Sequence, residues 1–456
     1  MSSDHVMNLK LGEFAKIKGG KRMPSGTPLV SYRTDHPYLR IVDFKDGSID
    51  RSNLQYVPNE VFPAISRYVI SSKDLYISIV GTIGLVGTVP PDLSGANLTE
   101  NAAKICEIDS SLINRDYLGY FLRSEVGQAE IRSLAVGSTQ PKLALFRIEQ
   151  IAVPCPPLEV QLGIASLLGA LDDRITLLRE TNTTLEAIAQ ALFKSWFIDF
   201  DPVRAKAEGR QPEGAIQGCM SAAEGRMPKA AMDATTAALF PDSFEESELG
   251  LVPKGWSIGC VGDLANQKKG SVNPLASPEV LFEHYSLPAF DSDQAPVFEL
   301  GQQIKSNKTP LPDEAVLLSK LNPHIPRVWL PVNHGANAVC STEFLAYSPQ
   351  EGVSKELIYC LFVAAEFQQQ LCQLVTGTSN SHQRVKPDQV LLVKIPIADK
   401  PVLKAFAELA KPLFERVHAN RQQAQTLTQL RDTLLPRLIS GQLRLPEAES
   451  LMEKAL

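Results

Sequence analysis

Apolar residues recur alternately every four and three positions along two stretches of the chain, one after residue 157 and one after residue 397. This heptad spacing is typical of helices that pair along an apolar seam. The first predicted seam contains Ile164, Leu168, Leu171, Ile175, Leu178, Asn182, Leu185, Ala189, Leu192 and Trp196. The second contains Phe406, Ala410, Leu413, Val417, Asn420, Ala424, Leu427, Arg431, Leu434 and Leu438. The pattern predicts two helices of about 40 residues, each about 60 Å long.

Each predicted helix follows a copy of one domain. Residues 11–20 (LGEFAKIKGG) correspond to residues 261–270 (VGDLANQKKG), and the strand at 151–156 corresponds to residues 391–396. A repeat of this length, near 240 residues, indicates a duplicated domain and is far too long for a solenoid. Within each copy, short β-branched and aromatic runs alternate with Gly, Pro, Asn and Asp, which predicts many short strands.

We therefore predict an α+β fold. Two strand-rich mixed domains are separated by a long antiparallel two-helix coiled coil, and a pseudo-twofold axis relates the two copies. The predicted boundaries are 1–157 for the first domain, 158–202 for the first long helix, 203–248 for a partly disordered linker or insertion, 249–397 for the second domain, 398–441 for the second long helix and 442–456 for a fraying tail. The linker is rich in Ala, Gly, Glu and Pro and has few large apolar residues.

The duplication also predicts how the two long helices meet. Matching Leu185 to Leu427 gives an offset of 242 residues, so the midpoints of the two seams fall at positions 180 and 422. Asn182 lies two positions after its midpoint and Asn420 lies two positions before its own. Antiparallel pairing would therefore bring the two amides face to face, where they can satisfy each other's hydrogen bonds and fix the register. The alternative is that each asparagine faces solvent or a partner protein.

Composition excludes several classes of protein. The net charge is −6, and neither copy is strongly basic: residues 9–157 hold 17 basic and 15 acidic side chains, and residues 258–397 hold 10 and 13. The seven cysteines form no Cys-x-x-Cys pair and the histidines form no H-E-x-x-H motif, so we expect no metal site. There is no phosphate-binding G-x-x-x-x-G-K-[ST] loop and no apolar run of about 20 residues. We expect a cytoplasmic protein with no catalytic residues.

Four segments resemble a known family. Residues 157–175 (PLEVQLGIASLLGALDDRI) and 191–202 (ALFKSWFIDFDP) resemble the central conserved region of Type I restriction-modification specificity subunits. Residues 427–441 (LTQLRDTLLPRLISG) resemble the distal conserved region, and residues 247–256 (SELGLVPKGW) resemble the start of the second recognition domain. The resemblance covers essentially the whole chain, but its specific motifs lie in the helices and the linker.

That resemblance implies a non-catalytic subunit that reads an asymmetric, bipartite target in double-stranded DNA. It implies two modification (methyltransferase) subunits and two restriction (motor-nuclease) subunits as partners. Adenine methylation from S-adenosylmethionine, and cleavage driven by ATP with Mg²⁺, would then belong to those partners alone. The chain itself lacks an N-P-P-Y type methylation motif, which agrees with this division of labour.

The residues suggest where DNA contacts would lie. Basic side chains surround a Gly-Gly turn near the N-terminus (Lys16, Lys18, Lys21 and Arg22), and a weaker counterpart lies in the second copy (Lys268 and Lys269). Such clusters suit phosphate oxygens, although a solvated loop has the same composition.

Loops at corresponding places in the two copies concentrate side chains that donate and accept hydrogen bonds, as base-reading residues do. They contain Ser138, Thr139, Gln140 and Lys142 in the first copy, and Thr378, Ser379, Asn380, His382, Arg384 and Lys386 in the second. Further candidates are Thr82 in a glycine-rich turn of the first copy, and Lys320 and Asn322 in the second. The alternative is a turn whose Ser, Thr and Asn side chains cap their own backbone.

Two features outside these loops bear on partners. Trp196 and Phe197 are candidates for base stacking, but their helical spacing favours packing at a helix end. A two-helix seam also leaves outer apolar residues that we expect a partner to cover: Leu167, Leu177, Ile188, Leu409 and Leu435.

Two other functions fit parts of the sequence. The alternative to a DNA reader is a duplicated coiled-coil adaptor, which would bind only proteins and have no affinity for DNA. An autonomous methyltransferase or nuclease would need catalytic motifs that the sequence lacks. Salt-dependent binding to duplex DNA separates a DNA reader from an adaptor.

Overall fold

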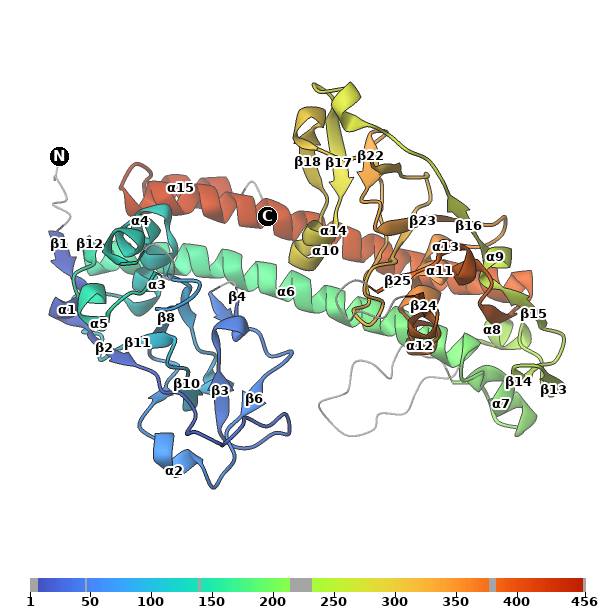
Figure 1. Cartoon of the computed structure of the whole chain (residues 1–456), viewed down its shortest axis with the longest axis horizontal. Helices are drawn as coiled ribbons and strands as arrows, with labels where there is room; N and C mark the ends of the chain where they lie inside the picture. The colour runs from blue at the N-terminus through green and yellow to red at the C-terminus, as the bar shows by residue number, and fades with distance from the viewer. Residues whose placement is uncertain (1–6, 46, 138–140, 214–231, 377–382, 454–456) are drawn as a thin grey trace. The chain divides into compact units, whose positions relative to one another are not determined.

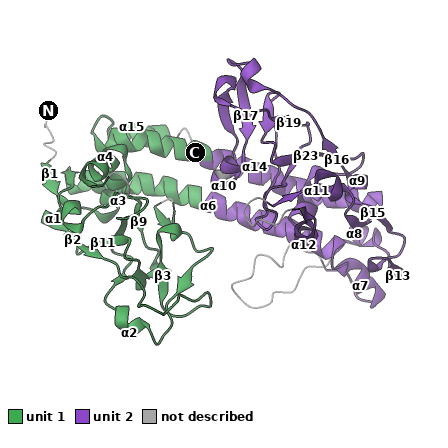
Figure 2. Cartoon of the chain, in the orientation of Figure 1, with its two compact units in different colours: residues 1–176, 425–456 green, residues 177–424 purple. Residues whose placement is uncertain are grey.

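The computed structural model describes residues 7–45, 47–137, 141–213, 232–376 and 383–453 (Figure 1). The chain divides into two compact units (Figure 2). Unit 1 contains residues 1–176 and 425–456, and unit 2 contains residues 177–424. Each unit holds one strand-rich part, which we call the first sheet domain (residues 7–155) and the second sheet domain (residues 257–397), together with a part of each long helix.

The first sheet domain contains two four-stranded sheets and a terminal strand pair. The order of one sheet is β2 (Lys16–Gly19), β11 (Ala102–Cys106), β8 (Leu75–Ser78), β9 (Val86–Thr88). The order of the other is β6 (Gln55–Tyr56), β3 (Pro37–Leu39), β10 (Ala96–Leu98), β7 (Val69–Ile70). The terminal pair joins β1 (Met7–Lys10) to β12 (Ala152–Cys155), and a small hairpin joins β4 (Phe44–Lys45) to β5 (Ser48–Ile49). The helices of unit 1 outside the long pair are α1 (Leu11–Phe14), α2 (Phe62–Ile65), α3 (Arg115–Arg123), α4 (Glu125–Leu134), α5 (Leu145–Ile148) and α15 (Leu445–Glu453).

The second sheet domain repeats the two four-stranded sheets and the terminal strand pair of the first. Its sheets have the orders β16 (Ala265–Lys268), β23 (Phe344–Pro349), β20 (Val316–Ser319), β21 (Val328–Trp329) and β18 (Val297–Leu300), β17 (Leu281–Tyr285), β22 (Ala338–Cys340), β19 (Thr309–Pro310). The terminal pair is β15 (Ser257–Cys260) with β26 (Lys394–Ile397), and a hairpin joins β24 (Val375–Thr376) to β25 (Arg384–Val385). Before this domain, unit 2 has a hairpin of β13 (Phe244–Ser247) with β14 (Gly250–Pro253). The shorter helices are α7 (Asp201–Ala207), α8 (Ala234–Ala238), α9 (Val261–Leu264), α10 (Leu287–Asp293), α11 (Lys355–Val363), α12 (Ala365–Gln373) and α13 (Pro387–Leu391).

Strand directions agree between the copies as well. The central pair is parallel in both second sheets, β10 with β3 and β17 with β22, whereas their other neighbours are antiparallel. Matching order and direction in eight strands confirm the duplication predicted from the sequence. The strands form because their inward residues are apolar: β8 and β20 are buried at every position.

The two long helices are α6 (Leu158–Phe197) and α14 (Lys400–Ile439). They start 242 residues apart and end 242 residues apart, which is the offset predicted from the seams. In unit 2, Asn182 contacts Asn420 and Phe193 contacts Phe406, so the helices run antiparallel. The predicted seam positions are buried in both helices except Leu185, Leu413 and Arg431, which are partly buried.

A buried glutamine links the start of α6 to the first sheet domain. The Gln161 side chain accepts a hydrogen bond from the backbone N–H of Asn114 at 2.8 Å. It donates to the carbonyls of Leu112 at 3.0 Å and Pro156 at 2.8 Å. Gln161 is 0% exposed, so these bonds supply the partners that water cannot reach. The direction in which α6 leaves the sheet domain is therefore set by hydrogen bonds as well as by apolar packing.

Two expectations about exposed parts of the chain are wrong. The segment after Gly441 is not a fraying tail: it forms α15, Ala448 is fully buried, and Leu445 lies so close to Gly163 that a Cβ there would be 2.5 Å from its Cδ1. Although the segment is rich in charged residues, its apolar residues recur at helical spacing, and it forms a helix that buries one face.

The outer apolar residues also need less cover from a partner than expected. Leu167, Ile188 and Leu435 are buried and Leu409 is partly buried, whereas Leu177 is 52% exposed. The chain itself covers most of these side chains, because each unit packs further elements against its part of the helix pair. Trp196 and Phe197 are buried among Phe240, Trp256 and Phe406, so they pack at a helix end as predicted.

Candidate nucleic-acid interface

The basic cluster of the first sheet domain lies on the edge strand β2 and the turn that follows it. The side chains of Lys16 and Lys18 lie on the same face of β2, and both ammonium groups lie 2.5 Å from the carboxylate of Glu107. Arg22 pairs with Glu100 at 2.6 Å. The Lys21 ammonium lies 5.7 Å from the centre of the Tyr68 ring. All four cations are exposed, and two carboxylates of the same domain partly neutralise them.

The neighbouring lysines strongly lower the pKa of Glu107, the acidic member of this cluster. Hydrogen bonds from Lys16 and Lys18 lower the pKa of Glu107 to about 2. Glu107 follows β11 and has a positive φ of 51°, a conformation that few non-glycine residues adopt. Its position opposite two lysines of the neighbouring strand arises from the pairing of β11 with β2. The carboxylate is therefore ionised throughout the physiological range and partly neutralises the two lysines.

Two of the predicted loops of the first sheet domain meet. Lys142 forms isolated bridges with both Val80 and Val136, and the Leu143 N–H donates to the carbonyl of Ile79 at 3.0 Å. Thr82 lies exposed at the turn between β8 and β9, where Gly81 and Gly84 have positive φ. Residues about 60 positions apart in the sequence thus lie in one place, with Thr82 and Lys142 both exposed.

The corresponding loops of the second sheet domain meet in the same way. The N–H of Val385 donates to the Lys320 carbonyl at 3.0 Å, and the N–H of Asn322 donates to the Gln383 carbonyl at 2.8 Å. Asn322 has a positive φ of 50°. The Arg384 guanidinium forms a two-bond ion pair with Glu343, at 3.1 and 3.0 Å.

The other predicted residues of the second sheet domain flank this place. Lys268 ends β16, and the Lys269 ammonium lies 3.7 Å from the carboxylate of Asp388 on α13. Lys386 is exposed and precedes α13. The remaining predicted contacts lie outside the described residues: Ser138, Thr139, Gln140, Thr378, Ser379, Asn380 and His382.

The seam asparagines form the amide pair predicted from the duplication. Asn420 Nδ2 donates to Asn182 Oδ1 at 2.9 Å, and Asn182 Nδ2 donates to the carbonyl of Val417 at 3.2 Å. The two side chains are 1% and 6% exposed, so water does not replace these bonds. A polar pair of this kind in an apolar seam favours one register, because any slip would leave both amides without partners.

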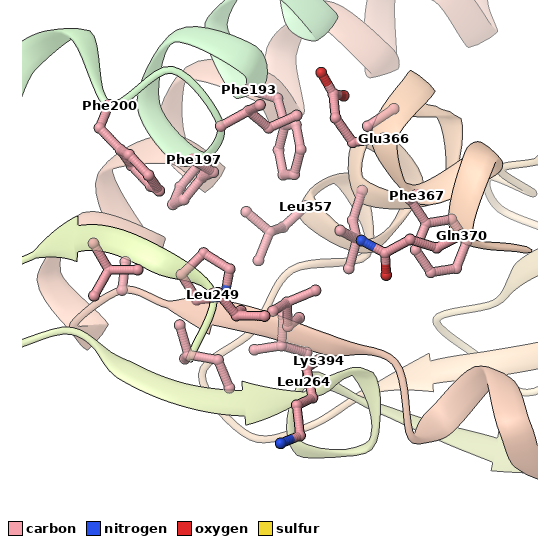
Figure 3. Close-up of a pocket in the computed structure, with 18 of the residues that line it drawn as sticks. Phe193, Phe197, Phe200, Leu249, Leu264, Leu357, Glu366, Phe367, Gln370 and Lys394 are labelled. Carbon is pink, nitrogen blue, oxygen red and sulfur yellow. The ribbon is translucent and has the colours of Figure 1, made fainter. Parts of the chain in front are cut away.

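An apolar cavity of about 290 Å³ lies in unit 2, between the end of α6, β14, α12 and β26 (Figure 3). Phe193, Phe197, Phe200 and Phe367 form much of its wall. Glu366, Gln370 and Lys394 are polar members of its lining, which is otherwise mainly apolar. No group of three or more His, Cys, Asp or Glu side chains within the described ranges could hold a metal ion.

Comparison with known proteins relates this architecture to one family. Residues 4–187 match the Type I restriction modification DNA specificity domain. The chain is 25% identical over 443 residues to the Type I restriction enzyme MjaIX specificity subunit of Methanocaldococcus jannaschii, an alignment that covers 90% of each chain. It is also 25% identical over 428 residues, 87% of each chain, to the HindI specificity subunit of Haemophilus influenzae. Over most of its length the chain is similar to Type I specificity subunits.

A solved Type I S subunit has the same fold. The S subunit of a Type-I restriction-modification system from M. genitalium matches 96% of this chain and 97% of its own length, with a TM-score of 0.54 at 12% identity. At that identity the likeness concerns the fold. No helix in the described parts of the present chain is long and apolar enough to cross a membrane.

Sequence reasoning missed the acidic side chains of the two clusters. Glu107, Glu100 and Glu343 each hold a basic residue that was predicted to contact DNA. No local signal marks them, because each lies on or beside a strand far along the chain from its partner. Strand pairing brings them together, and the pairing was not predicted in detail.

Proposed function

We propose that this chain is the DNA-reading subunit of a Type I restriction-modification enzyme, and that each sheet domain reads one half of an asymmetric, bipartite target. The observation that carries the proposal is the duplicated domain in which the same two loops meet but present different side chains. In one copy the turn that contains Thr82 pairs with Lys142 through Val80, and in the other Asn322 bonds to Gln383, beside Arg384. Different side chains in equivalent places read different base sequences.

The subunit itself performs no chemistry in this proposal. Specificity subunits are non-catalytic in this family and assemble with other subunits. Two modification subunits would bind S-adenosylmethionine and methylate adenine, and two restriction subunits would use ATP and Mg²⁺ to move and cut DNA. The purified chain alone should therefore show no methylation, cleavage or ATP hydrolysis, and it needs no cofactor of its own. Turnover that follows the pure chain through further purification would contradict this division.

Methylation mapping tests the proposal. Adenine methylation is mapped across the genome of the source with and without this gene. We expect one bipartite motif to disappear with the gene and to return when the gene is restored. The purified complex with its modification partner should bind a duplex that carries this motif, with an affinity that falls steeply as salt rises. An unchanged methylation map, together with no duplex binding by the complex, would favour the protein-only adaptor.

A further inference from the structure

The duplicated halves hold their sheet domains to the long helices through different polar contacts. In unit 1 the contacts meet at Asp172 of α6. One oxygen of this carboxylate accepts a hydrogen bond from the Tyr120 hydroxyl of α3 at 2.8 Å, and the other accepts one from Arg431 of α14 at 2.7 Å. A single carboxylate thus joins both long helices to a helix of the first sheet domain.

Arg123 extends this contact into the sheet domain. Its guanidinium lies 3.7 Å from the Asp172 carboxylate and 4.5 Å from the centre of the Tyr120 ring. It also lies directly against Gly47 in the β4–β5 turn, where a Cβ would be only 2.0 Å from the guanidinium nitrogen. Gly47 has a φ of 76°, so that turn both requires glycine and leaves room for the arginine. The side chains of Arg123, Asp172 and Arg431 are each about one quarter exposed or less.

In unit 2, Arg421 of α14 makes the corresponding contacts. Its Nη2 donates to Glu186 of α6 at 2.7 Å and to Gln294 at 2.7 Å. Gln294 ends α10 of the second sheet domain and has a positive φ of 50°. Arg421 therefore joins both long helices to an element of the sheet domain, as Asp172 does in unit 1.

Several residues that make these contacts differ between the copies. At the 242-residue offset, Asp172 corresponds to Phe414 and Arg431 corresponds to Ala189. Glu186 corresponds to Thr428. Arg421 corresponds to Arg179, but its partner Glu186 does not recur, so the polar attachments of the two copies use different sets of residues. Apolar packing holds a domain on a helix with little directional preference, whereas hydrogen bonds to a charged group require defined distances and angles.

We infer that Asp172 and Arg421 are positioning residues that hold each sheet domain at a set angle on the helix pair and so restrict the half-site spacing that the subunit accepts. This inference rests on the proposed function, because spacing has meaning only if each domain reads a half-site. Neither residue needs to touch DNA. Loss of either contact lets one domain tilt, and a tilted domain can reach a half-site at a neighbouring spacing.

The test uses the complete complex of this chain with its modification subunits. Methylation rates are measured on duplexes in which the mapped half-sites are separated by the native spacing or by one or two base pairs more or fewer. The variants are Asp172→Asn, Tyr120→Phe, Arg421→Gln and Gln294→Ala. Asp173→Asn and Arg416→Gln are matched controls, since they make the same changes at exposed positions of the same helices.

We expect the rate ratio between native and neighbouring spacings to fall by a factor of about 3 to 10 in the four variants, the range expected for loss of one or two hydrogen bonds. The two controls should keep the wild-type ratio. Equal slowing at every spacing would overturn the inference, because it would reveal a merely structural role. If Asp172→Asn or Arg421→Gln does not fold, Tyr120→Phe and Gln294→Ala decide. A wild-type complex that methylates no bipartite motif would instead contradict the proposed function.

Discussion

The buried amide pair offers the sharpest test of the helix seam. In Asn420→Leu, the Oδ1 atom of Asn182 loses its donor, while the bond from Asn182 Nδ2 to the Val417 carbonyl remains possible. In Asn182→Leu, the Nδ2 group of Asn420 loses its acceptor. Both amides lie in a seam that water does not enter, so each single change leaves one polar group buried without a partner.

Such an orphaned group costs about 1 to 3 kcal/mol, whereas replacing both partners with apolar side chains of similar size is nearly neutral. We therefore expect each single variant to lower the free energy of unfolding by about 1 to 3 kcal/mol. The double variant Asn182→Leu/Asn420→Leu should lie within about 1 kcal/mol of the wild type. The two changes are coupled because the residues share one hydrogen bond.

Urea denaturation of the chain, followed by circular dichroism at 222 nm, measures this coupling as a double-mutant cycle. The cycle should be restricted to variants whose transitions have the same slope, since a chain of two units can depart from two-state unfolding. Costs of the two single changes that simply add in the double variant would refute the reasoning, because independent amides share no bond. The double variant should also show a looser register, which cysteine cross-linking between exposed helix positions would reveal.

Three further predictions concern the interface and the fold. Lys21→Ala should weaken binding of the complex to all duplexes and lower the slope of log affinity against log salt concentration by about one. Glu107→Gln should strengthen binding, because it releases two lysines. A changed base preference with an unaltered salt slope in Lys21→Ala would contradict the assignment to phosphate. Exchange of residues 11–153 for those of a relative should alter one half of the methylated motif, and alteration of both halves would exclude modular reading. In denaturant titrations, Gly127→Ala should lower the free energy of unfolding by at least about 2 kcal/mol, because its Cβ would lie 2.1 Å from a backbone oxygen. Gly169→Ala should be tolerated, because the atom nearest to its Cβ would be 3.9 Å away.

Periodic features of this protein follow from its sequence. The two heptad runs predict α6 and α14, and the offset between them places Asn182 opposite Asn420 without reference to any structure. These predictions succeed because helix periodicity is a local property, and because two copies of one helix overlap along their whole length in an antiparallel pair only when their midpoints meet. The strand-rich character of both domains follows in the same way from short apolar runs between turn residues.

The tertiary structure alone decided which distant residues lie together. The pairing of the Thr82 turn with Lys142, and of the Asn322 turn with the segment that contains Arg384, depends on strand order and on the bridges between loops. The acids that hold the predicted DNA-binding cations depend on the pairing of β11 with β2, and the contacts of Asp172 and Arg421 depend on how α3 and α10 lie on the helices. The charged composition of the C-terminal segment predicted a fraying tail. The structure instead has the helix α15 there, and Ala448 of this helix is buried. A side chain's partners are set by packing across the fold, and no local pattern along the chain encodes them.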